Sequence, residues 1–251
     1  MSPPRYEVIG VEALPEIVRG DDLARLIVDA AARQGTPLLD RDMLVISQKI
    51  VSKSEGRVVR LSSVTPSARA RQLAEELGRD PLLTEVILRE SRRVVRTGLG
   101  LMIVETHHGW VCANAGVDQS NVDADTACLL PEDSDRSACG IRDRLRELTG
   151  HALAIVIADT FGRPWREGLC NVAVGLAGFQ PITNYLGERD PAGHVLQATI
   201  LALADEVAAA AEPVMGKLSR IPVAIIRGLD WQPGEGTSRE LLRDPARDLF
   251  R

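Results

Sequence analysis

The sequence predicts an α+β fold in which mixed sheets are flanked by helices. Short apolar runs that suit buried strands occur between stretches whose apolar residues recur at helical spacing. One pair of apolar runs is separated by a short polar turn, which is typical of a β-hairpin and favours a mixed sheet over a purely parallel one. The 251 residues can bury a large core and contain no long polar linker. We therefore expect two subdomains whose segments interleave along the chain.

The N-terminal part of the chain contains one predicted helix and one predicted strand. The helical run 23–34 follows the acidic pair Asp21-Asp22, whose side chains can cap its first turn. The apolar run 42–47 suits a buried strand. The polar stretch 48–57 that follows reads as a loop after this strand.

Two further helices are each preceded by a capping residue and a proline. Thr65-Pro66 opens the helical run 67–78, and Asp80-Pro81 opens the run 82–91. The remaining predicted elements are a hairpin with strands over 101–105 and 110–114 around a turn over 106–109, a helix over 135–148, a strand over 153–158, a long alanine-rich helix over 193–211, and a strand over 221–227.

The composition argues against several functional classes. The net charge of -5 is unlike that of a general nucleic-acid binder, and only 3% of the residues are aromatic, which leaves few side chains to stack on bases. The four cysteines include no CxxC pair, so they indicate neither a zinc site nor a disulfide framework. The N-terminus lacks an apolar signal core, and no apolar run approaches the ~20 residues that span a bilayer. We expect a cytoplasmic protein with neither membrane nor nucleic-acid partners.

The sequence contains no GxxxxGK[ST] loop, no GxGxxG between a strand and a helix, no GxSxG and no HExxH. Instead, four polar segments interrupt the apolar structure. The first, 47–57, carries Lys49, Lys53 and Arg57 beside small residues. Ammonium groups near glycine and serine suit phosphate oxygens, because they neutralise charge while the backbone can approach closely. A solvated loop is the alternative.

The second segment, 112–125, follows a predicted strand and is rich in oxygen donors. Its polar side chains are Asp118, Gln119, Ser120, Asn121, Asp123 and Asp125. Clustered hard oxygen ligands are what Mg²⁺ or Mn²⁺ requires, although the spacing does not fit an EF-hand loop. A plain acidic turn is the alternative.

The third segment, 155–168, reads IVIADTFGRPWREG and places an acid and a hydroxyl where apolar strand is expected to end. Asp159 and Thr160 therefore either close a turn or contribute to the same cation site as Asp118. Arg163 and Arg166 could pair with a carboxylate or a phosphate. The fourth segment, 215–222, either carries Lys217 toward a ligand or simply ends the preceding helix.

Taken together, these segments resemble the coenzyme F420:L-glutamate ligase family, which attaches glutamate to the deazaflavin coenzyme F420. The resemblance covers nearly the whole chain and is carried by the motifs ALPEI, SQKIVSKSEGR, ANAGVDQSN, ADTFGRPWREG, ADEVAAAAEPVMGK, IPVAIIRG and PGEGTSRELLRDPARDLFR. It implies an α+β fold that forms an intertwined homodimer. It also implies a single ligase domain over residues 1–251, without the nitroreductase-like domain that follows it in some members.

The resemblance implies a GTP- and metal-dependent amide ligase acting on F420-0 and L-glutamate, and on further γ-linked glutamates in some cases. Mg²⁺ or Mn²⁺ would be held by Asp118, Asp159 and Thr160, with Asp118, Asp159 and Lys53 as the catalytic residues. GTP would be contacted by Leu14, Pro15, Glu16, Ile17, Gln48, Lys49, Lys53, Asn121, Met215, Gly216, Lys217, Leu218, Ser219, Arg220, Ile221 and Pro222. Gln48 and Lys217 depart from the family pattern, which has Ser and a metal-associated Gln there in some members. Potassium is a further candidate cofactor.

The implied mechanism agrees with these residue types. Because a carboxylate is a poor electrophile, the γ-phosphoryl group of GTP would first convert the acceptor's carboxylate into an acyl phosphate, which the glutamate amine then attacks. Cations and Lys53 would neutralise charge on the transferred group. Two other functions fit the same residues. These are a related nucleotide-dependent amide ligase acting on another carboxylate acceptor, and a nucleotide-binding regulator without turnover.

Overall fold

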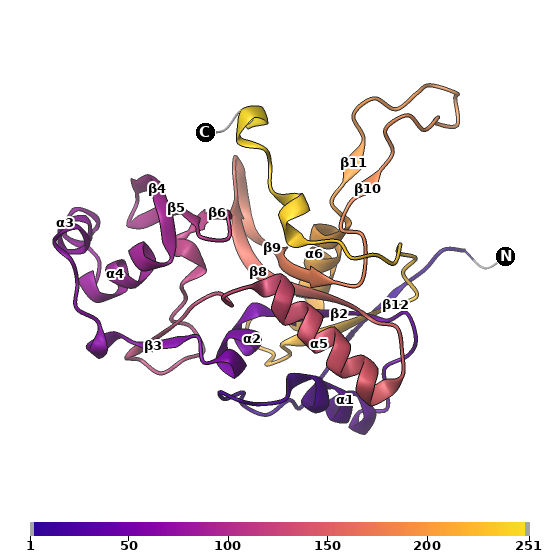
Figure 1. The fold of residues 1–251 in the computed structure, drawn as a ribbon, viewed down its shortest axis with the longest axis horizontal. Coiled ribbons are helices and arrows are strands. Elements are labelled where there is room, and N and C mark those ends of the chain that lie inside the picture. The colour runs from indigo at the N-terminus through magenta and orange to yellow at the C-terminus, as the bar shows by residue number, and fades with distance from the viewer. Residues whose placement is uncertain (1–2, 249–251) are drawn as a thin grey trace.

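The computed structural model describes residues 3–248 and is built around a mixed five-stranded sheet (Figure 1). The predicted α+β class and mixed sheet are confirmed. The strand order is β1-β12-β2-β8-β9, in which β2 and β8 are parallel and every other neighbouring pair is antiparallel. Its strands are β1 (Glu7–Gly10), β2 (Met43–Ser47), β8 (Ala154–Arg163), β9 (Arg166–Ala177) and β12 (Val223–Arg227).

Alternating side chains of this sheet enter two separate hydrophobic clusters. Along β2, Leu44 and Ile46 join the cluster that also contains α1 (Leu23–Arg33) and α5 (Ser134–Thr149). Met43 and Val45 point to the opposite face, where α6 (Leu203–Met215) packs. Because successive strand residues face opposite sides, helices on both faces require the uninterrupted apolar runs that the sequence shows for β2 and the first half of β8.

A smaller unit with its own hydrophobic core is inserted between α2 (Gln48–Glu55) and α5. All residues of this third cluster fall between Leu61 and Leu129, apart from partly buried neighbours such as Val59. The unit contains β3 (Val58–Arg60), α3 (Ala68–Leu77), α4 (Pro81–Arg89), β4 (Ser91–Gly98), β5 (Leu101–Thr106), β6 (Val111–Ala113) and β7 (Thr126–Cys128). Its three-stranded sheet β4-β5-β6 includes the predicted hairpin between β5 and β6.

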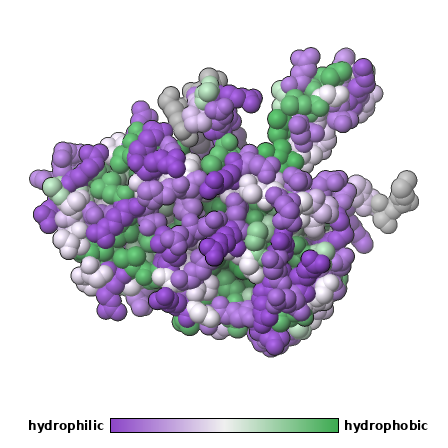
Figure 2. Space-filling model, viewed as in Figure 1, coloured by the Kyte–Doolittle hydropathy of each residue, from purple (hydrophilic) through white to green (hydrophobic). Residues whose placement is uncertain are grey.

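A long β-arm extends away from the body of the protein (Figure 1). We define it as residues 183–201, which begin with β10 (Thr183–Asn184) and end with β11 (Ile200–Leu201). Large apolar side chains remain exposed along it, namely Tyr185, Leu186, Val195, Ile200 and Leu201, and Figure 2 shows hydrophobic residues near its base and tip. Exposed apolar residues in this number on one projecting segment are typical of an interaction surface.

Four local predictions are corrected by the structure. Residues 48–55 form helix α2 rather than a loop, because Ile50 and Val51 pack one of its faces into the core. Strand β8 continues to Arg163, so Asp159 and Thr160 lie within a strand. Ser67, not Thr65, caps α3, and α6 begins at Leu203, ten residues later than predicted, because residues 193–202 belong to the β-arm and its return to the body.

The predicted domain over 1–251 extends past the described residues at both ends, and the last three residues of the C-terminal motif lie outside them. None of the helices in the described part of the chain has the length and apolar character needed to cross a bilayer.

Candidate active site

A large cleft lies where the main sheet meets the smaller unit and has a volume of about 1310 Å³. Strands β2 and β8 run in parallel, with Ser47 opposite Ala158, so their carboxyl ends reach the same edge of the sheet. Lys49 at the start of α2 and Asp159 on β8 therefore both line this cleft. In sheets that contain parallel strands, this edge is where ligands most often bind.

Most residues that the sequence singles out lie in the wall of this cleft. They are Leu14, Pro15, Glu16, Ile17, Lys49, Lys53, Asp118, Asn121, Asp159, Thr160, Met215, Gly216, Lys217, Arg220, Ile221 and Pro222. The structure thus brings together segments as far apart in the sequence as Leu14 and Pro222.

Eight candidate site residues from the sequence analysis lie elsewhere, and three of them are Arg57, Gln119 and Asp125. Gln48 is buried beneath the cleft, where its Oε1 accepts a hydrogen bond of 2.9 Å from the Ser52 hydroxyl. Leu218 is 94% exposed, and the Ser219 hydroxyl donates to the carbonyl of Met215 at the end of α6. Arg163 and Arg166 sit at the exposed turn between β8 and β9, where the Arg163 guanidinium donates to the carbonyl oxygens of Glu167 and Gly168.

Asp118 is held at the cleft by an unusual turn in the smaller unit. Asn114, Ala115 and Gly116 are consecutive residues with positive φ angles of 54°, 57° and 68°. Two backbone hydrogen bonds then tie Asp118 to Cys128, and the Arg79 guanidinium donates to the Asn114 side chain at 2.6 Å. Non-glycine residues in the left-handed region are strained, and such strain is concentrated at functional sites.

The Asp118 carboxylate is neutralised by Lys49, whose Nζ lies 2.6 Å from Oδ2. The same carboxylate accepts hydrogen bonds from the backbone N–H and the hydroxyl of Ser120, at 2.7 and 2.9 Å. Burial by itself would raise the pKa of Asp118, but the hydrogen bond and charge of Lys49 and the two bonds from Ser120 hold it below its usual range. Asp118 therefore stays ionised at neutral pH.

The pKa of Asp159 is shifted in the opposite direction. Burial raises the pKa of Asp159 to about 6, and the nearby Asp118 charge adds to this effect. A hydrogen bond from the Thr160 backbone and the charges of Lys49 and Lys217 oppose the increase. The pKa values of the two carboxylates are thus shifted in opposite directions, although both residues line one cleft.

Thr160 belongs to a closed circuit of four side chains, which we call the Thr160 circuit. Lys217 Nζ lies 2.5 Å from Thr160 Oγ1, and the Thr160 hydroxyl donates to Asn171 Oδ1 at 2.7 Å. Asn171 Nδ2 donates to Glu212 Oε2 at 2.7 Å, and Lys217 returns to Glu212 Oε1 at 3.2 Å. Strand β9, helix α6 and the loop that follows α6 each supply one of the other three members of the circuit.

Asn171 and Glu212 line the cleft but were not found from the sequence. The available signal was weak, since Asn171 is one polar residue in the apolar run LCNVAVGLA and β9 was not predicted at all. A second signal was stronger. The chain contains only three lysines, Lys49, Lys53 and Lys217, and all three line the cleft, while every other basic residue is an arginine.

Each lysine has a carboxylate partner. Lys49 pairs with Asp118, Lys217 with Glu212, and Lys53 with Glu16, whose Oε1 lies 2.5 Å from Nζ. The lysine ammonium is a compact, strongly hydrated point charge that suits phosphate groups. The arginine guanidinium is planar and suits bidentate pairing with a carboxylate or phosphate. A polyphosphate that enters the cleft could therefore bind three ammonium groups, each of which would give up its carboxylate partner for a phosphate oxygen.

The donor chemistry of the cleft fits a hard divalent cation. Asp118, Asp159 and Thr160 offer two carboxylates and a hydroxyl as oxygen donors, and all three residues line one cleft. Within residues 3–248 no group of three or more histidine, cysteine, aspartate or glutamate side chains could hold a metal ion. A sparse oxygen donor set suits Mg²⁺ or Mn²⁺, which keep waters and substrate phosphates among their ligands, better than it suits zinc.

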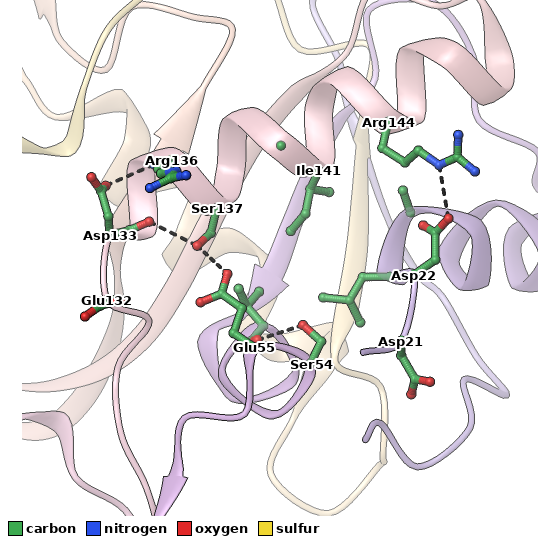
Figure 3. Close-up of a pocket in the computed structure, with 14 residues that line it drawn as sticks. Asp21, Asp22, Ser54, Glu55, Glu132, Asp133, Arg136, Ser137, Ile141 and Arg144 are labelled. Carbon is green, nitrogen blue, oxygen red and sulfur yellow. Dashed lines mark hydrogen bonds and ion pairs between the residues drawn. The ribbon is translucent and has the colours of Figure 1, made fainter. Parts of the chain in front are cut away.

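A second pocket of about 690 Å³ lies between α1, α2 and α5 (Figure 3). Several of its polar side chains already have structural partners. Asp22 caps α1 and binds Arg144 at 3.0 Å, Asp133 caps α5, and the Ser137 hydroxyl donates to Glu55 at 2.5 Å. We therefore assign the candidate active site to the larger cleft.

Comparison with known proteins gives a consistent result. Residues 12–228 match the family model described as F420-0:Gamma-glutamyl ligase. The coenzyme F420:L-glutamate ligase of Methanothermobacter thermautotrophicus is 48% identical over 247 residues, which are 97% of this chain and 98% of the relative. The corresponding ligases of Methanopyrus kandleri and Methanocaldococcus jannaschii are 45% and 40% identical, over 92% and 98% of this chain and 92% and 97% of the relatives. The cleft and these matches together identify the chain as a member of the F420-0:gamma-glutamyl ligase family of enzymes.

Proposed function

We propose that this protein joins L-glutamate to F420-0 in coenzyme F420 biosynthesis, using GTP and a divalent metal ion. The observation that carries the proposal is the identity of 38–48% to coenzyme F420:L-glutamate ligases over nearly the entire chain. The cleft supports it, since the ANAGVDQSN and ADTFGRPWREG motifs bring Asp118 and Asp159 to one cavity with all three lysines.

The reaction requires a carboxylate to become an electrophile. The γ-phosphoryl group passes from GTP to the terminal carboxylate of the acceptor, which forms an acyl phosphate and releases GDP. The glutamate amine then attacks the acyl carbon, the bond to the phosphate oxygen breaks, and the amine loses a proton as the amide forms. Such transfers depend mostly on positioning and on neutralising the transferred group.

The residues of the cleft suit these tasks. Asp118, Asp159 and Thr160 would hold the divalent ion, which supplies positive charge next to the phosphates when bound. Lys53 would turn from Glu16 toward the nucleotide, and Lys49 keeps the Asp118 carboxylate ionised. The segments 14–17 and 215–222, most of whose residues line the cleft, would also contact the nucleotide.

A mass assay tests the proposal. The protein is incubated with F420-0, L-glutamate, GTP and Mn²⁺, and the acceptor is expected to gain the mass of one glutamyl residue, or of several. Reactions with ATP in place of GTP, and with other carboxylate acceptors, separate this activity from that of a related amide ligase. Bound GTP without any product under all conditions would favour the regulator instead.

An isotope experiment tests the acyl phosphate. If the acceptor carboxylate carries ¹⁸O, one labelled oxygen should appear in the released phosphate, because the bond from phosphorus to the carboxylate oxygen persists when the amide forms. Unlabelled phosphate would contradict the intermediate while leaving the ligase activity intact. Repeating the assay with and without K⁺ tests whether a monovalent ion assists.

We further propose that the chain forms a homodimer through the β-arm. The arm projects from the body, and its exposed apolar side chains would be buried against a second copy. Light scattering after size-exclusion chromatography should give twice the chain mass of 27.2 kDa. Replacing Leu186 and Ile200 by serine should give monomers, and an unchanged dimer would assign the interface to another surface.

A further inference from the structure

The Thr160 circuit fixes the direction of every hydrogen bond in it. The Glu212 carboxylate only accepts, so the Asn171 amide atom that contacts Oε2 at 2.7 Å is the donating Nδ2. The atom that faces Thr160 is then the oxygen, which also only accepts. The Thr160 hydroxyl must therefore donate its single proton to Asn171, 2.7 Å away.

This direction determines what Thr160 can offer the cleft. With its proton directed to Asn171, the Thr160 oxygen turns its lone pairs elsewhere, and the Lys217 ammonium occupies one of them at 2.5 Å. A hydroxyl whose proton could rotate freely would offer those lone pairs only part of the time. We propose that Asn171 is a positioning residue that holds the Thr160 hydroxyl as an acceptor toward a divalent cation, and that the Lys217 ammonium takes the place of that cation until it binds.

The surroundings of Asn171 fit this role. Asn171 is 4% exposed, and it lies directly opposite Thr160 in the antiparallel pairing of β8 with β9. Its amide therefore cannot turn toward solvent, and strand pairing sets its separation from Thr160. Buried groups that orient metal ligands commonly change metal affinity by about 10–100-fold when they are removed.

Lys217 has the mobility that an exchangeable cation requires. Its side chain is 61% exposed and extends from the loop that begins at Gly216, whereas the Glu212 side chain is 29% exposed. On leaving Thr160, the ammonium can keep Glu212 as its partner or turn to a phosphate. The divalent ion and Lys217 would then compete for the same oxygen, so that removing the ammonium strengthens metal binding.

The inference rests on the proposed function for the identity of the cation, but direct metal binding tests it without turnover. Free Mn²⁺ is measured by electron paramagnetic resonance in the protein without substrates. Asn171→Ala is expected to weaken Mn²⁺ binding by about tenfold, and Lys217→Met to strengthen it. Asn184→Ala, in the β-arm, serves as the matched control and should leave Mn²⁺ binding unchanged.

A charge swap separates orientation from general damage. Asn171→Asp alone keeps the acceptor for Thr160 but sets two carboxylates against each other, so it should weaken Mn²⁺ binding. Adding Glu212→Gln restores a donor opposite the new carboxylate and keeps an oxygen for Lys217, so the double variant should recover Mn²⁺ binding.

Folded variants are identified by their circular dichroism and melting temperature. Wild-type Mn²⁺ affinity in Asn171→Ala, or no recovery in a folded double variant, would overturn the role of Asn171. Weaker Mn²⁺ binding in Lys217→Met would overturn the competition. If the expected Mn²⁺ shifts occur in a protein that adds no glutamate to F420-0, the inference stands and the proposed function fails.

Discussion

Lys49 lies 2.6 Å from one carboxylate of the cleft, that of Asp118, and leaves the other, Asp159, without a comparably close ammonium. As a result the pKa of Asp118 is lowered, while burial raises the pKa of Asp159 to about 6. The protein therefore keeps a costly charge at Asp159 in the absence of a cation, as expected of a site that is selected for binding rather than for stability.

Asp159→Asn should stabilise the metal-free protein above pH 6. The folded state holds the Asp159 proton more tightly than the unfolded chain does, with a pKa of about 6 against 3.8, so the free energy of unfolding falls as the pH rises from 3.8 to 6. The difference corresponds to at most about 3 kcal/mol. Melting temperatures in EDTA should show the variant above the wild type at pH 8, with the gap closing near pH 4.

Asp118→Asn is the matched comparison and should act in the opposite direction. Because the folded pKa of Asp118 is lowered, its ionised form stabilises the fold above its unfolded pKa, and this contribution disappears as the pH falls through the folded value. The variant should melt below the wild type at pH 8. Equal shifts for the two variants would contradict the electrostatic difference between the two acids.

Loss of either acid should nearly abolish ligase activity. Asp118→Ala and Asp159→Ala would each remove an anionic group from the cleft, with an expected decrease in kcat/KM of at least about 100-fold. Circular dichroism should show both variants folded. Asp143→Ala changes an exposed acid outside the cleft and should retain normal kinetics. Normal turnover in either cleft variant would remove that acid from the metal site.

Lys53→Ala should mainly weaken nucleotide binding. The Lys53 ammonium now pairs with Glu16, and both side chains line the cleft beside Asp118. We expect an increase in the KM for GTP of about tenfold, since a charge-assisted hydrogen bond contributes about 1.5–3 kcal/mol, with a smaller change in the KM for glutamate. An unchanged GTP titration would place Lys53 outside the nucleotide site.

Amine-specific reagents should report on the cleft alone. The three lysines are the only side-chain amines of the protein and all line the cleft, so acylation followed by peptide mapping should modify only these positions and the N-terminal α-amine. GTP with Mn²⁺ should slow the modification of Lys53, while the α-amine provides an internal reference. Equal rates with and without nucleotide would argue against lysine contacts to phosphate.

Gly116→Ala should destabilise the protein more than Gly78→Ala does. Both glycines have similar positive φ angles, 68° and 64°, so both variants lose about 1–2 kcal/mol from backbone strain. A Cβ at Gly116 would also lie 2.9 Å from Leu130 Cγ, whereas one at Gly78 meets open space. Chemical denaturation should give a larger loss for Gly116→Ala, and only this variant should lose activity, because the turn carries Asp118.

Elements with a strong local pattern were predicted correctly from the sequence. Helix α1 has a capping aspartate and one apolar face, and the hairpin of β5 and β6 has two apolar runs around a tight polar turn. Helix α2 was missed because its eight residues are mostly polar and only Ile50 and Val51 reveal its buried face. Tertiary packing, rather than local propensity, determines that segment.

The candidate site likewise contains residues that could be predicted from the sequence and residues that could not. Asp118, Asp159 and the lysines stand out because charged residues follow apolar runs, and the motifs that contain them are distinctive. Asn171 could not be found, because its contact with Thr160 depends on the pairing of β8 with β9, which is interrupted by irregularities between Ile157 and Ala158 and between Gly162 and Arg163. No sequence spacing predicts such a register.

The separate hydrophobic cores have a mechanical consequence for ligand binding. Asp118 belongs to the inserted unit, whereas Asp159 belongs to the main sheet, and both residues line the cleft between these two parts. A cation bound by both would act as a removable crosslink between these two parts, in addition to the Lys49–Asp118 ion pair and the packing of Trp110 into the main core. Amide hydrogen exchange over residues 61–129 should therefore slow when Mn²⁺ is added. The ion would then make the protein more rigid as well as supplying positive charge to the cleft.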